Sequence, residues 1–468
     1  MSLRPHHILM AFAFTTVIGL LILLCPWFIH LGALYDPFGD GMLIVVGLQG
    51  IAWCTWVVAS LIRECRSEST GETENDSPAV GRIGLIEILL LAFVGGLWLA
   101  LFWGRVRDPV LLADDYQYVR VASSWETTFQ DLFTPFAEHY CVITRLFTCL
   151  LCTSISPPAW PRALGLSGMG LFLVSLLLFH WFVRQEFRSP TMALIASSLF
   201  GLTTVHREVI QWYSASQWCW GVLLLFASLL IIQSNRADFK GWRIVAVGIL
   251  AAIAPFNYSV GFLVGPLSAI YLACHSRIDR KPLRLEYCLV PLLATLPFLL
   301  VSFLPRVAEK FTHATQGGWP VSEAIAPIRG VVYGVRSTVD LLVLRNCGAG
   351  RIIGQPTFLY AVPFLLGAYA VGELIRRTPR PCGAILGCAL VIIPYAVVLP
   401  FRGWVRYEDV IDWSRYQLFP QIGVALLVCS LCATLGPDWV VAPTLSLRHA
   451  ILVVACATAL FMLHAFGA

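Results

Sequence analysis

Long apolar runs alternate with short polar clusters along the whole chain. An apolar run of about 20 residues is long enough to cross the hydrocarbon core of a bilayer as a helix, and a helix satisfies its own backbone hydrogen bonds there. The pattern predicts an all-α fold, a polytopic transmembrane helix bundle of about 13 spans, within a range of roughly 12 to 14. We expect spans at 8–29, 41–62, 83–103, 163–183, 190–208, 213–233, 242–256, 258–275, 286–304, 357–376, 383–400, 416–436 and 447–466.

The composition agrees with this class of protein. Hydrophobic residues make up 58% of the chain and charged residues 13%, whereas a soluble globular chain carries roughly a quarter charged residues. The formal net charge of +5 comes from Lys and Arg residues scattered among the predicted loops. We therefore expect a lipid bilayer as partner and no nucleic acid. Many cysteines fall in or beside apolar runs, where they act as small hydrophobes.

One set of alternate loops is rich in Lys and Arg, which predicts the orientation of the chain. These loops lie within 63–82, 184–188, 236–243, 277–284 and 376–380, and short loops of this kind stay in the cytoplasm. All of them share one side only if the apolar stretch 141–156 does not cross the membrane. Because this stretch is short and polar in places, we predict an interfacial helix, a cytoplasmic N-terminus and an external C-terminus.

Polar and broken segments divide the chain further. The polar segment 64–82 predicts a cytoplasmic linker. It separates two accessory transmembrane helices, in 1–82, from a transmembrane module in 83–436, and a last helix lies in 437–468. The stretch 242–275 is too long for one span, and Pro255 predicts a break into two helices joined by a tight external turn. The external segments of most interest are 104–162, 305–356 and 401–415, since long loops are often functional.

The first external segment begins with two adjacent acidic residues, Asp114 and Asp115. A solvated turn or a helix cap is one interpretation of the pair, and a functional pair of carboxylates near the headgroup level is the other. Farther on, Ser123 and Glu126 have the spacing of a capping box. The next apolar positions share one face of a helix, which predicts a helix lying on the membrane surface. That face consists of Trp125, Phe129, Leu132 and Phe133.

A cluster of Glu138, His139 and Arg145 lies between this helix and the next one. Taken alone, His139 is typical of a structural hydrogen bond, and Arg145 is typical of an anchor to lipid phosphate. The combination favours a site, because cationic groups neutralise the charge that develops on a departing phosphate.

Basic and aromatic residues alternate in loop 401–415. This mixture predicts either an interfacial belt or the wall of a site. Arginine holds phosphate with two hydrogen bonds, and arginines near span ends also serve as snorkelling anchors. The arginines to which both interpretations apply are Arg402, Arg406 and Arg415.

Two other segments carry open alternatives. In 321–344, apolar residues follow helical spacing, which predicts either a surface helix over a cavity or simple packing. The corner at 206–213 holds a short run of charged and aromatic residues between two spans. We interpret this corner as a structural cap rather than a site.

The external residues together resemble the GT-C class of polytopic membrane glycosyltransferases, which includes protein mannosyltransferases and aminoarabinose transferases. In that class a carboxylate pair follows the first conserved span. A loop with two juxtamembrane helices and a His-containing turn comes next, and an Arg precedes the following span. The matching residues are Asp114-Asp115, Glu138-His139, Arg162, the break at Pro255–Ser259, and Ser414-Arg415-Tyr416, all within 83–436. The chain departs from the class in having no prolines after His139 and two extra leading spans.

The resemblance implies a transferase that takes a sugar from a polyprenyl-phosphate donor and passes it to a glycan, lipid or protein acceptor. The reaction would take place on the external side of a membrane, for which we expect the bacterial inner membrane. Asp114 or Asp115 would act as a base or as a ligand of a divalent metal, Mg²⁺ or Mn²⁺, with inversion at the anomeric carbon. The residues expected to contact substrate or phosphate are Glu138, His139, Arg145, Arg402, Arg406, Arg415 and Tyr416.

Two other functions stay open from the sequence. A transporter or flippase for a lipid-linked or polar solute predicts charged residues that face a pathway within the spans, whereas Glu87, Glu208 and Glu373 lie at or near span ends. It is also often built from internal repeats, and none is clear. A glycan ligase or polymerase predicts a late external loop rich in Arg and His, which 305–356 resembles.

Overall fold

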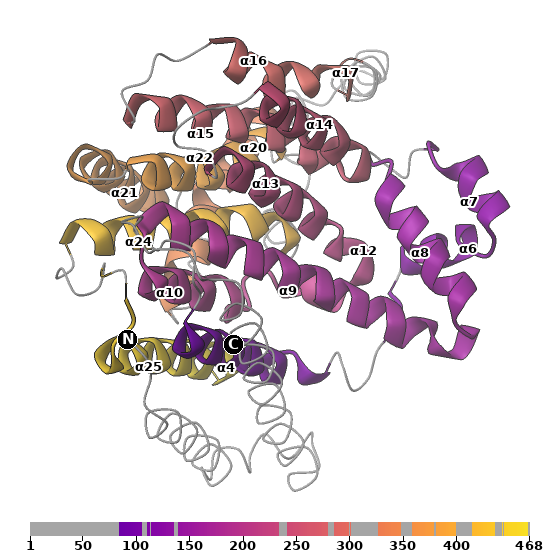
Figure 1. Ribbon diagram of the computed structural model, residues 1–468, viewed down its shortest axis with the longest axis horizontal. Coiled ribbons are helices and arrows are strands. Elements are labelled where there is room, and N and C mark those ends of the chain that lie inside the picture. The colour runs from indigo at the N-terminus through magenta and orange to yellow at the C-terminus, as the bar shows by residue number, and fades with distance from the viewer. Residues whose placement is uncertain are drawn as a thin grey trace, which may run out of the picture.

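The computed structural model describes residues 84–104, 110–112, 114–134, 139–233, 241–278, 285–298, 300, 326–347, 358–378, 381–398, 414–435, 442 and 444–466. Every regular element in this part of the chain is a helix, and most of the helices lie side by side in one bundle (Figure 1). Their bounds are α4 Leu85–Leu101, α6 Asp115–Val121, α7 Trp125–Asp131, α8 Val142–Ser154, η1 Pro157–Ala159, α9 Trp160–Phe187, α10 Pro190–Gly201, α11 Arg207–Gln211, α12 Tyr213–Ser216, α13 Trp218–Gln233, α14 Gly241–Asn257, η2 Ser259–Leu263, α15 Val264–Ile278, α16 Leu285–Ala294, α17 Leu296–Phe298, α20 Ala326–Ser337, η4 Thr338–Leu344, η5 Arg345–Cys347, α21 Phe358–Arg377, α22 Pro381–Val398, η7 Ser414–Gln417, α24 Leu418–Leu435 and α25 Leu447–Phe466.

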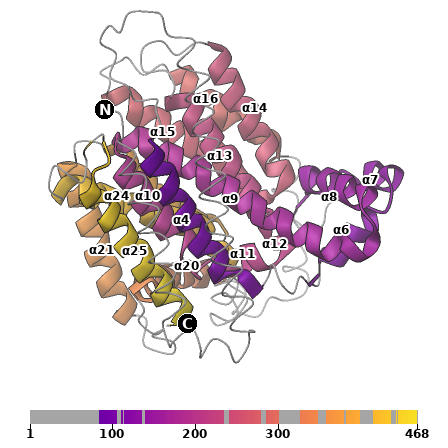
Figure 2. The ribbon, with the colours of Figure 1, turned by 60° about the horizontal axis from the view of Figure 1, so that its bottom comes forward.

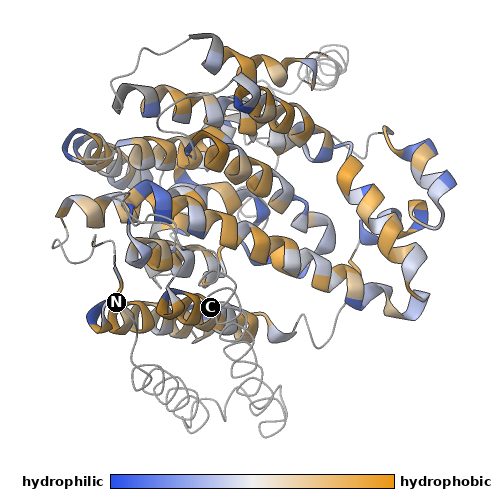
Figure 3. Cartoon of the chain, viewed as in Figure 1, coloured by the Kyte–Doolittle hydropathy of each residue, from blue (hydrophilic) through white to orange (hydrophobic). Residues whose placement is uncertain are grey.

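Among the described residues, four helical stretches are long and apolar enough to cross a membrane. Shorter apolar helices lie beside them, and hydrophobic residues run along most of each helix in the bundle (Figure 3). The long stretches are Pro157–Phe187, Tyr213–Gln233, Ser414–Leu435 and Leu447–Ala465. The predicted all-α protein with membrane-spanning helices is confirmed at this level. The number of spans stays a prediction, and the spans predicted at 8–29 and 41–62 lie outside the described residues.

One predicted span, 190–208, is too long, because α10 ends at Gly201. The Thr203 hydroxyl accepts a hydrogen bond from the Val205 N–H at 3.2 Å, and such local bonds compete with the helical ladder. The chain then turns and forms the short helices α11 and α12 before α13 begins. This turn is important for the candidate functional site, because residues of the turn make several of the contacts in that site.

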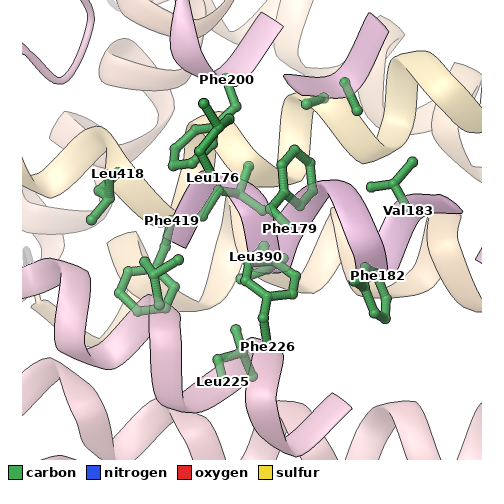
Figure 4. Close-up of a cluster of buried hydrophobic side chains, with 14 of the residues drawn as sticks. Leu176, Phe179, Phe182, Val183, Phe200, Leu225, Phe226, Leu390, Leu418 and Phe419 are labelled. Carbon is green, nitrogen blue, oxygen red and sulfur yellow. The ribbon is translucent and has the colours of Figure 1, made fainter. Parts of the chain in front are cut away.

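Aromatic side chains from several helices form the core of the bundle (Figure 4). Phe179 and Phe182 of α9 lie against Phe226 of α13, with ring centroids 5.2 Å and 5.3 Å apart. Phe179 also meets Phe200 of α10 at 5.4 Å, and Leu390 of α22 is fully buried in the same cluster. Because lipid tails are as apolar as these side chains, close packing holds such helices together.

The helices α22 and α24 approach each other closely at two glycines. A Cβ atom on Gly423 would lie 2.5 Å from the Gly387 carbonyl oxygen, and one on Gly387 would lie 2.9 Å from the Gly423 carbonyl oxygen. The obstructing atoms belong to the backbone and have no rotamer to change. Glycine is therefore required at both positions, as is common where membrane helices pack tightly.

We expect Gly423→Ala to destabilise the protein by about 1–3 kcal/mol, as overpacking does. The matched control is Gly367→Ala in α21, because nothing lies within 4 Å of a Cβ atom there. Alanine at that position is expected to be neutral or to stabilise by up to about 1 kcal/mol. Thermal unfolding of both variants in detergent measures the difference, and equal melting temperatures would contradict the close approach of α22 and α24.

The break predicted near Pro255 is present, two residues farther on. The helix α14 continues through Pro255 to Asn257, and the 3₁₀ turn η2 leads into α15. A Cβ atom on Gly261, in this turn, would lie 2.3 Å from the Ala254 carbonyl oxygen. The stretch 242–275 therefore forms two helices joined by a tight turn, as the sequence predicts.

The first external segment folds into α6, α7 and α8, which stand apart at the N-terminal end of α9 (Figure 1 and Figure 2). The longest of the three, α8, has 13 residues. A helix of that length is about 20 Å long and does not cover a hydrocarbon core of roughly 30 Å. The predicted helix at 141–156 is thus present and too short to span, in agreement with an interfacial position.

The start of α7 differs from the predicted capping box. The N-cap is Ser124, not Ser123, and its hydroxyl accepts a hydrogen bond from the Thr127 N–H at 3.2 Å. Thr127 therefore occupies the position that Glu126 was predicted to have. Phe129, on the predicted apolar face, is 60% exposed, and the position of this face on a membrane stays a prediction.

The predicted helix at 321–344 is present as α20 and the π-helical stretch η4. It packs against α21, α22 and α24. Val339 and Leu342 are buried, which favours packing over a free surface position for this part of the segment.

A buried charged cluster joins α4, α9 and α10. The Oε1 atom of Glu87 lies 2.8 Å from Arg184 Nε and 3.1 Å from His180 Nε2. His180 Nδ1 lies 3.0 Å from Ser197 Oγ on α10. Glu87 is in the first turn of α4 and Arg184 in the last turn of α9, so the charges lie near helix ends. Because buried charges are costly unless they are paired, the cluster fixes how these three helices lie against each other.

Candidate functional site

The two aspartates at the start of α6 have different surroundings. Asp115 is fully buried. Its Oδ1 accepts hydrogen bonds from the Ser214 N–H at 2.8 Å and the Ser214 hydroxyl at 2.5 Å, and its Oδ2 accepts from the Leu112 N–H at 2.9 Å. Asp114, the N-cap residue, is partly exposed, and its carboxylate has no hydrogen-bond partner among the described residues. Asp115 therefore fixes the loop, and Asp114 is the carboxylate with free oxygen atoms.

The corner at 206–213, together with Ser214, connects the loop that carries Asp114 and Asp115, called the acidic loop here, to the start of α24. Trp212 Nε1 donates a hydrogen bond to the Leu112 carbonyl at 3.3 Å, which adds a second link beside the Ser214–Asp115 contact. The Arg415 guanidinium lies 5.2 Å from the centroid of the Trp212 ring, within range of a cation–π interaction. The loop with the acid pair and the turn with Arg415 thus meet at one corner, although they are far apart in the sequence.

An ion pair between Glu208 and Arg415 lies at the same corner. Arg415 Nη1 is 2.6 Å from Glu208 Oε1, and the Arg415 N–H donates to Glu208 Oε2 at 3.1 Å. The Glu208 N–H donates to the Ser414 hydroxyl at 2.9 Å. Burial raises the pKa of Glu208, and the positive charge of Arg415 acts against that rise. The pair holds a mostly buried positive charge in a defined place.

An aromatic wall joins two of the predicted site residues, His139 and Tyr416. The His139 ring stacks on Tyr258 with centroids 3.7 Å apart. Tyr258 lies 5.4 Å from Trp218, which in turn meets Tyr416 edge-on at 5.4 Å. The Arg415 guanidinium is 5.5 Å from the Tyr416 ring centroid. We call Tyr258, Trp218 and Tyr416 the aromatic wall.

The N-terminus of α8 is held by the break between α14 and α15. The Asn257 Oδ1 atom accepts hydrogen bonds from the Thr144 N–H at 3.1 Å and the Thr144 hydroxyl at 3.2 Å. The preceding Cys141 has a φ of 58°, a left-handed conformation that is uncommon for a side-chain-bearing residue. Burial raises the pKa of the Cys141 thiol to about 12, so the thiol is neutral. Its sulfur accepts a hydrogen bond from the Tyr118 hydroxyl at 3.1 Å.

Arg145 is engaged at the C-terminal end of α7. Its Nη1 donates to the carbonyls of Asp131, Leu132 and Thr134, with the last at 2.6 Å. Its Nη2 lies 3.4 Å from Asp131 Oδ2, and the residue is 4% exposed. These bonds satisfy carbonyls at a helix end and attach α8 to α7. This geometry gives Arg145 a structural role, and phosphate binding by this residue stays a prediction.

The structure brings four predicted site residues into one connected group. Links through the corner and the aromatic wall join Asp115, His139, Arg415 and Tyr416. Asp114 adjoins the group through Asp115. The predicted residues Glu138, Arg402 and Arg406 lie outside the described residues.

Several contacts of this group were missed by the sequence interpretation. At the corner 206–213, which the sequence predicts to be a structural cap, Glu208 and Trp212 both contact Arg415. The local pattern does not single out this corner, because charged and aromatic residues are common at span ends. Nothing in the local pattern indicated that Asn257 would bind the start of α8, because that contact spans 113 residues.

The described residues do not make up a metal site. No group of three or more His, Cys, Asp and Glu side chains is arranged to hold an ion in this part of the chain. Both oxygens of Asp115 accept hydrogen bonds from N–H or O–H donors, whereas Asp114 is partly exposed. The predicted Mg²⁺ or Mn²⁺ at Asp114 and Asp115 stays a prediction, and no reaction step below depends on a metal.

We expect the stability of the protein to be acid-sensitive because of His206, which lies in the turn before α11. Its ring lies 5.1 Å from that of Phe172 and 5.2 Å from that of Phe200, and burial lowers its pKa to about 3. Because of this lowered pKa, the folded protein binds fewer protons at His206 than the unfolded protein does below about pH 6.5. The free energy of unfolding therefore decreases as the pH falls from about 6.5 toward about 3. The loss amounts to about 2 kcal/mol at pH 5.

His206→Phe should remove this part of the acid sensitivity, because a phenyl ring fits the aromatic surroundings and takes up no proton. The measurement is the melting temperature of both proteins in detergent, at about pH 7.5 and about pH 5. We expect a smaller fall in the variant. An equal fall in both proteins would show that His206 is not the responsible group.

The chain matches no protein-family model, and neither a curated protein nor a solved structure is similar to it. The class that the structure supports is therefore the general one of helical proteins with membrane-spanning helices. The helices α6–α8, the acid pair and the Arg415 corner are the features on which a more specific function rests.

Proposed function

We propose that the chain is a membrane glycosyltransferase. It moves a sugar from a polyprenyl-phosphate donor to a glycan, lipid or protein acceptor on the external side of a bacterial inner membrane, with the N-terminus in the cytoplasm. The observation that carries the proposal is the meeting of the acidic loop with Arg415 at one corner, through Trp212 and Ser214. A carboxylate and a cation held close together are what transfer from a phosphate leaving group needs.

The reaction follows from the roles of these groups. An acceptor oxygen forms a bond to the anomeric carbon while the bond from that carbon to the phosphate oxygen breaks, and the phosphate leaves with the electron pair. Asp114 takes the proton from the acceptor hydroxyl. Attack opposite the leaving group inverts the anomeric carbon.

Arg415 and Asp115 have the other two roles in the proposed reaction. Arg415 stabilises the negative charge that develops on the phosphate. It contacts Glu208 and lies over Trp212, and these contacts fix its position before the substrate arrives. Asp115 positions the loop through Ser214 and touches no substrate.

The alternatives have less support. A transporter needs charged groups that face a pathway, whereas the buried charges of Glu87 and Arg184 contact each other. A glycan ligase or polymerase would use the loop 305–356, most of which lies outside the described residues. Neither alternative is favoured by a specific contact.

A direct assay separates these functions. The full chain is reconstituted in proteoliposomes with polyprenyl phosphate that carries a radiolabelled hexose, and a cell-envelope fraction is added as a source of acceptors. We expect label in the acceptor fraction together with release of unlabelled polyprenyl phosphate. Label that only crosses the bilayer, still attached to its lipid, would identify a carrier and refute the transferase.

A further inference from the structure

The ion pair of Glu208 and Arg415 lies where a ligand can reach it. The side chain of Arg415 is 17% exposed and that of Glu208 is 18% exposed, whereas the Glu87 side chain in the buried charged cluster is 2% exposed. The pair adjoins the acidic loop through Trp212. A phosphate that arrives at this corner therefore meets Arg415 with the Glu208 carboxylate already beside it.

Both partners of the pair are held in place. The Arg415 guanidinium lies 5.2 Å from the centroid of the Trp212 ring and 5.5 Å from that of Tyr416, and the Arg415 N–H donates to Glu208 Oε2 at 3.1 Å. The Glu208 N–H donates in turn to the Ser414 hydroxyl at 2.9 Å. A phosphate bound to Arg415 consequently shares one positive charge with a carboxylate that stays close to it.

Two negative charges beside one positive charge favour protonation of the carboxylate. Burial raises the pKa of Glu208, and the positive charge of Arg415 acts against that rise. A phosphate at Arg415 offsets part of this positive charge and adds a negative charge nearby, while the burial of Glu208 remains. Both changes disfavour the ionised carboxylate.

The surroundings of Glu208 contain few other charges. The helix α11 packs against η7, α9 and α12. Among the described residues, the charged groups that act on Glu208 are Arg415 of η7 and Arg207, which is exposed on α11 itself. The titratable side chains that η7 and α12 add are the phenols of Tyr416 and Tyr213, a type of group that carries no charge near neutral pH, and α9 meets the turn before α11 through an aromatic ring.

We infer that binding of the donor phosphate at Arg415 is coupled to the uptake of one proton by Glu208, whose neutral carboxyl group then donates a hydrogen bond to a phosphate oxygen. The inference rests on the proposed function and adds to it a second phosphate-binding group and a dependence of binding on pH. The proton comes from the surrounding water and adds to a carboxylate oxygen. No covalent bond of the donor breaks in this step, and the proton is released when the phosphate leaves.

Equilibrium binding at several pH values, without an acceptor, tests the inference apart from catalysis. The full chain in detergent is titrated with polyprenyl methyl phosphate, a phosphodiester without a sugar. A diester lacks the second ionisation that phosphate monoesters undergo near pH 6, so the charge of the ligand is constant. Because the bound state holds one more proton than the free state, we expect Kd to rise by up to about tenfold for each pH unit between about pH 6 and about pH 8.

The number of protons taken up is measured on the original protein. Calorimetric titrations in two buffers with different enthalpies of ionisation give this number directly. We expect net uptake of close to one proton per bound lipid at the alkaline end of the range, where Glu208 of the free protein is ionised.

Two variants assign the proton to Glu208. Glu208→Gln keeps the shape of the side chain and cannot ionise, so its Kd should be independent of pH, and at about pH 8 it should bind the lipid about tenfold more tightly than the original protein does. Glu126→Gln, at an exposed position of α7, is the matched control and should keep the pH dependence of the original protein.

Each outcome has a defined meaning. Absence of binding at every pH would refute the proposed donor, and the inference with it. Binding with a constant Kd and no proton uptake would refute the inference alone. A pH dependence that persists in Glu208→Gln would assign the proton to another group, such as His139, and would also refute it. If Glu208→Gln does not fold, His139→Gln decides between the two groups, because the pH dependence should remain in that variant and its loss would overturn the inference.

Discussion

Asp114→Asn is expected to lower the rate of sugar transfer by about 10²–10⁴-fold, the usual contribution of a general base. The reason is the difference between the two neighbouring carboxylates. The carboxylate of Asp114 is partly exposed and has no partner among the described residues, so it can accept a proton from an acceptor hydroxyl. The variant should keep the melting temperature of the original protein, because no side-chain contact is lost.

Asp115→Asn is the matched comparison, one residue away. Asparagine keeps one oxygen for Ser214 but turns an N–H group toward the Leu112 N–H, which now donates to Asp115 Oδ2. Leaving a buried donor unpaired costs about 1–3 kcal/mol, so this variant should lose stability first and activity as a consequence. Full transfer activity in Asp114→Asn, or in the double variant to alanine, would refute the assigned role of the acid pair.

Glu87→Ala is expected to destabilise the protein by about 3–5 kcal/mol, because it leaves buried charge uncompensated. Glu87 is 1% exposed and contacts both Arg184 and His180. Its removal takes the counter-charge from Arg184 and a hydrogen-bond partner from His180 at once. The measurement is the melting temperature and the yield of monodisperse protein after extraction from the membrane.

Glu373→Ala provides the control for this experiment. Glu373 also pairs with basic residues, Arg376 at 2.7 Å and Arg377 at 3.3 Å, but these arginines are 77% and 70% exposed. Exposed pairs contribute about 0–1 kcal/mol, so Glu373→Ala should change the melting temperature little. A similar loss in both variants would show that burial does not decide the strength of these pairs.

The helix positions were predictable from the sequence because each depends on local hydrophobicity. The apolar runs gave α4, α9, α13, α22, α24 and α25 to within a few residues, and Pro255 gave the break after α14. The short length of α8 and its polar residues separated it from the long helices. The residue that caps a helix was harder to predict, since the N-cap of α7 is Ser124, one residue after the predicted Ser123.

The contacts that assemble the candidate site were beyond such reasoning. Asp115 binds Ser214, and Glu208 binds Arg415, and neither partner can be chosen from hydropathy or spacing. The sequence presents Asp114 and Asp115 as an equivalent pair. Their different burial and hydrogen bonding depend on tertiary packing and could not be predicted from the sequence.

The glycine contact between α22 and α24 has a consequence for any motion during the proposed sugar transfer. With the backbones touching at Gly387 and Gly423, neither helix has room to slide or rotate past the other. The turn that carries Arg415 continues directly into α24, so a shift of this cation relative to the acidic loop would have to displace both helices as a rigid pair. Rearrangements that admit a bulky lipid donor are therefore expected on the α6–α8 side.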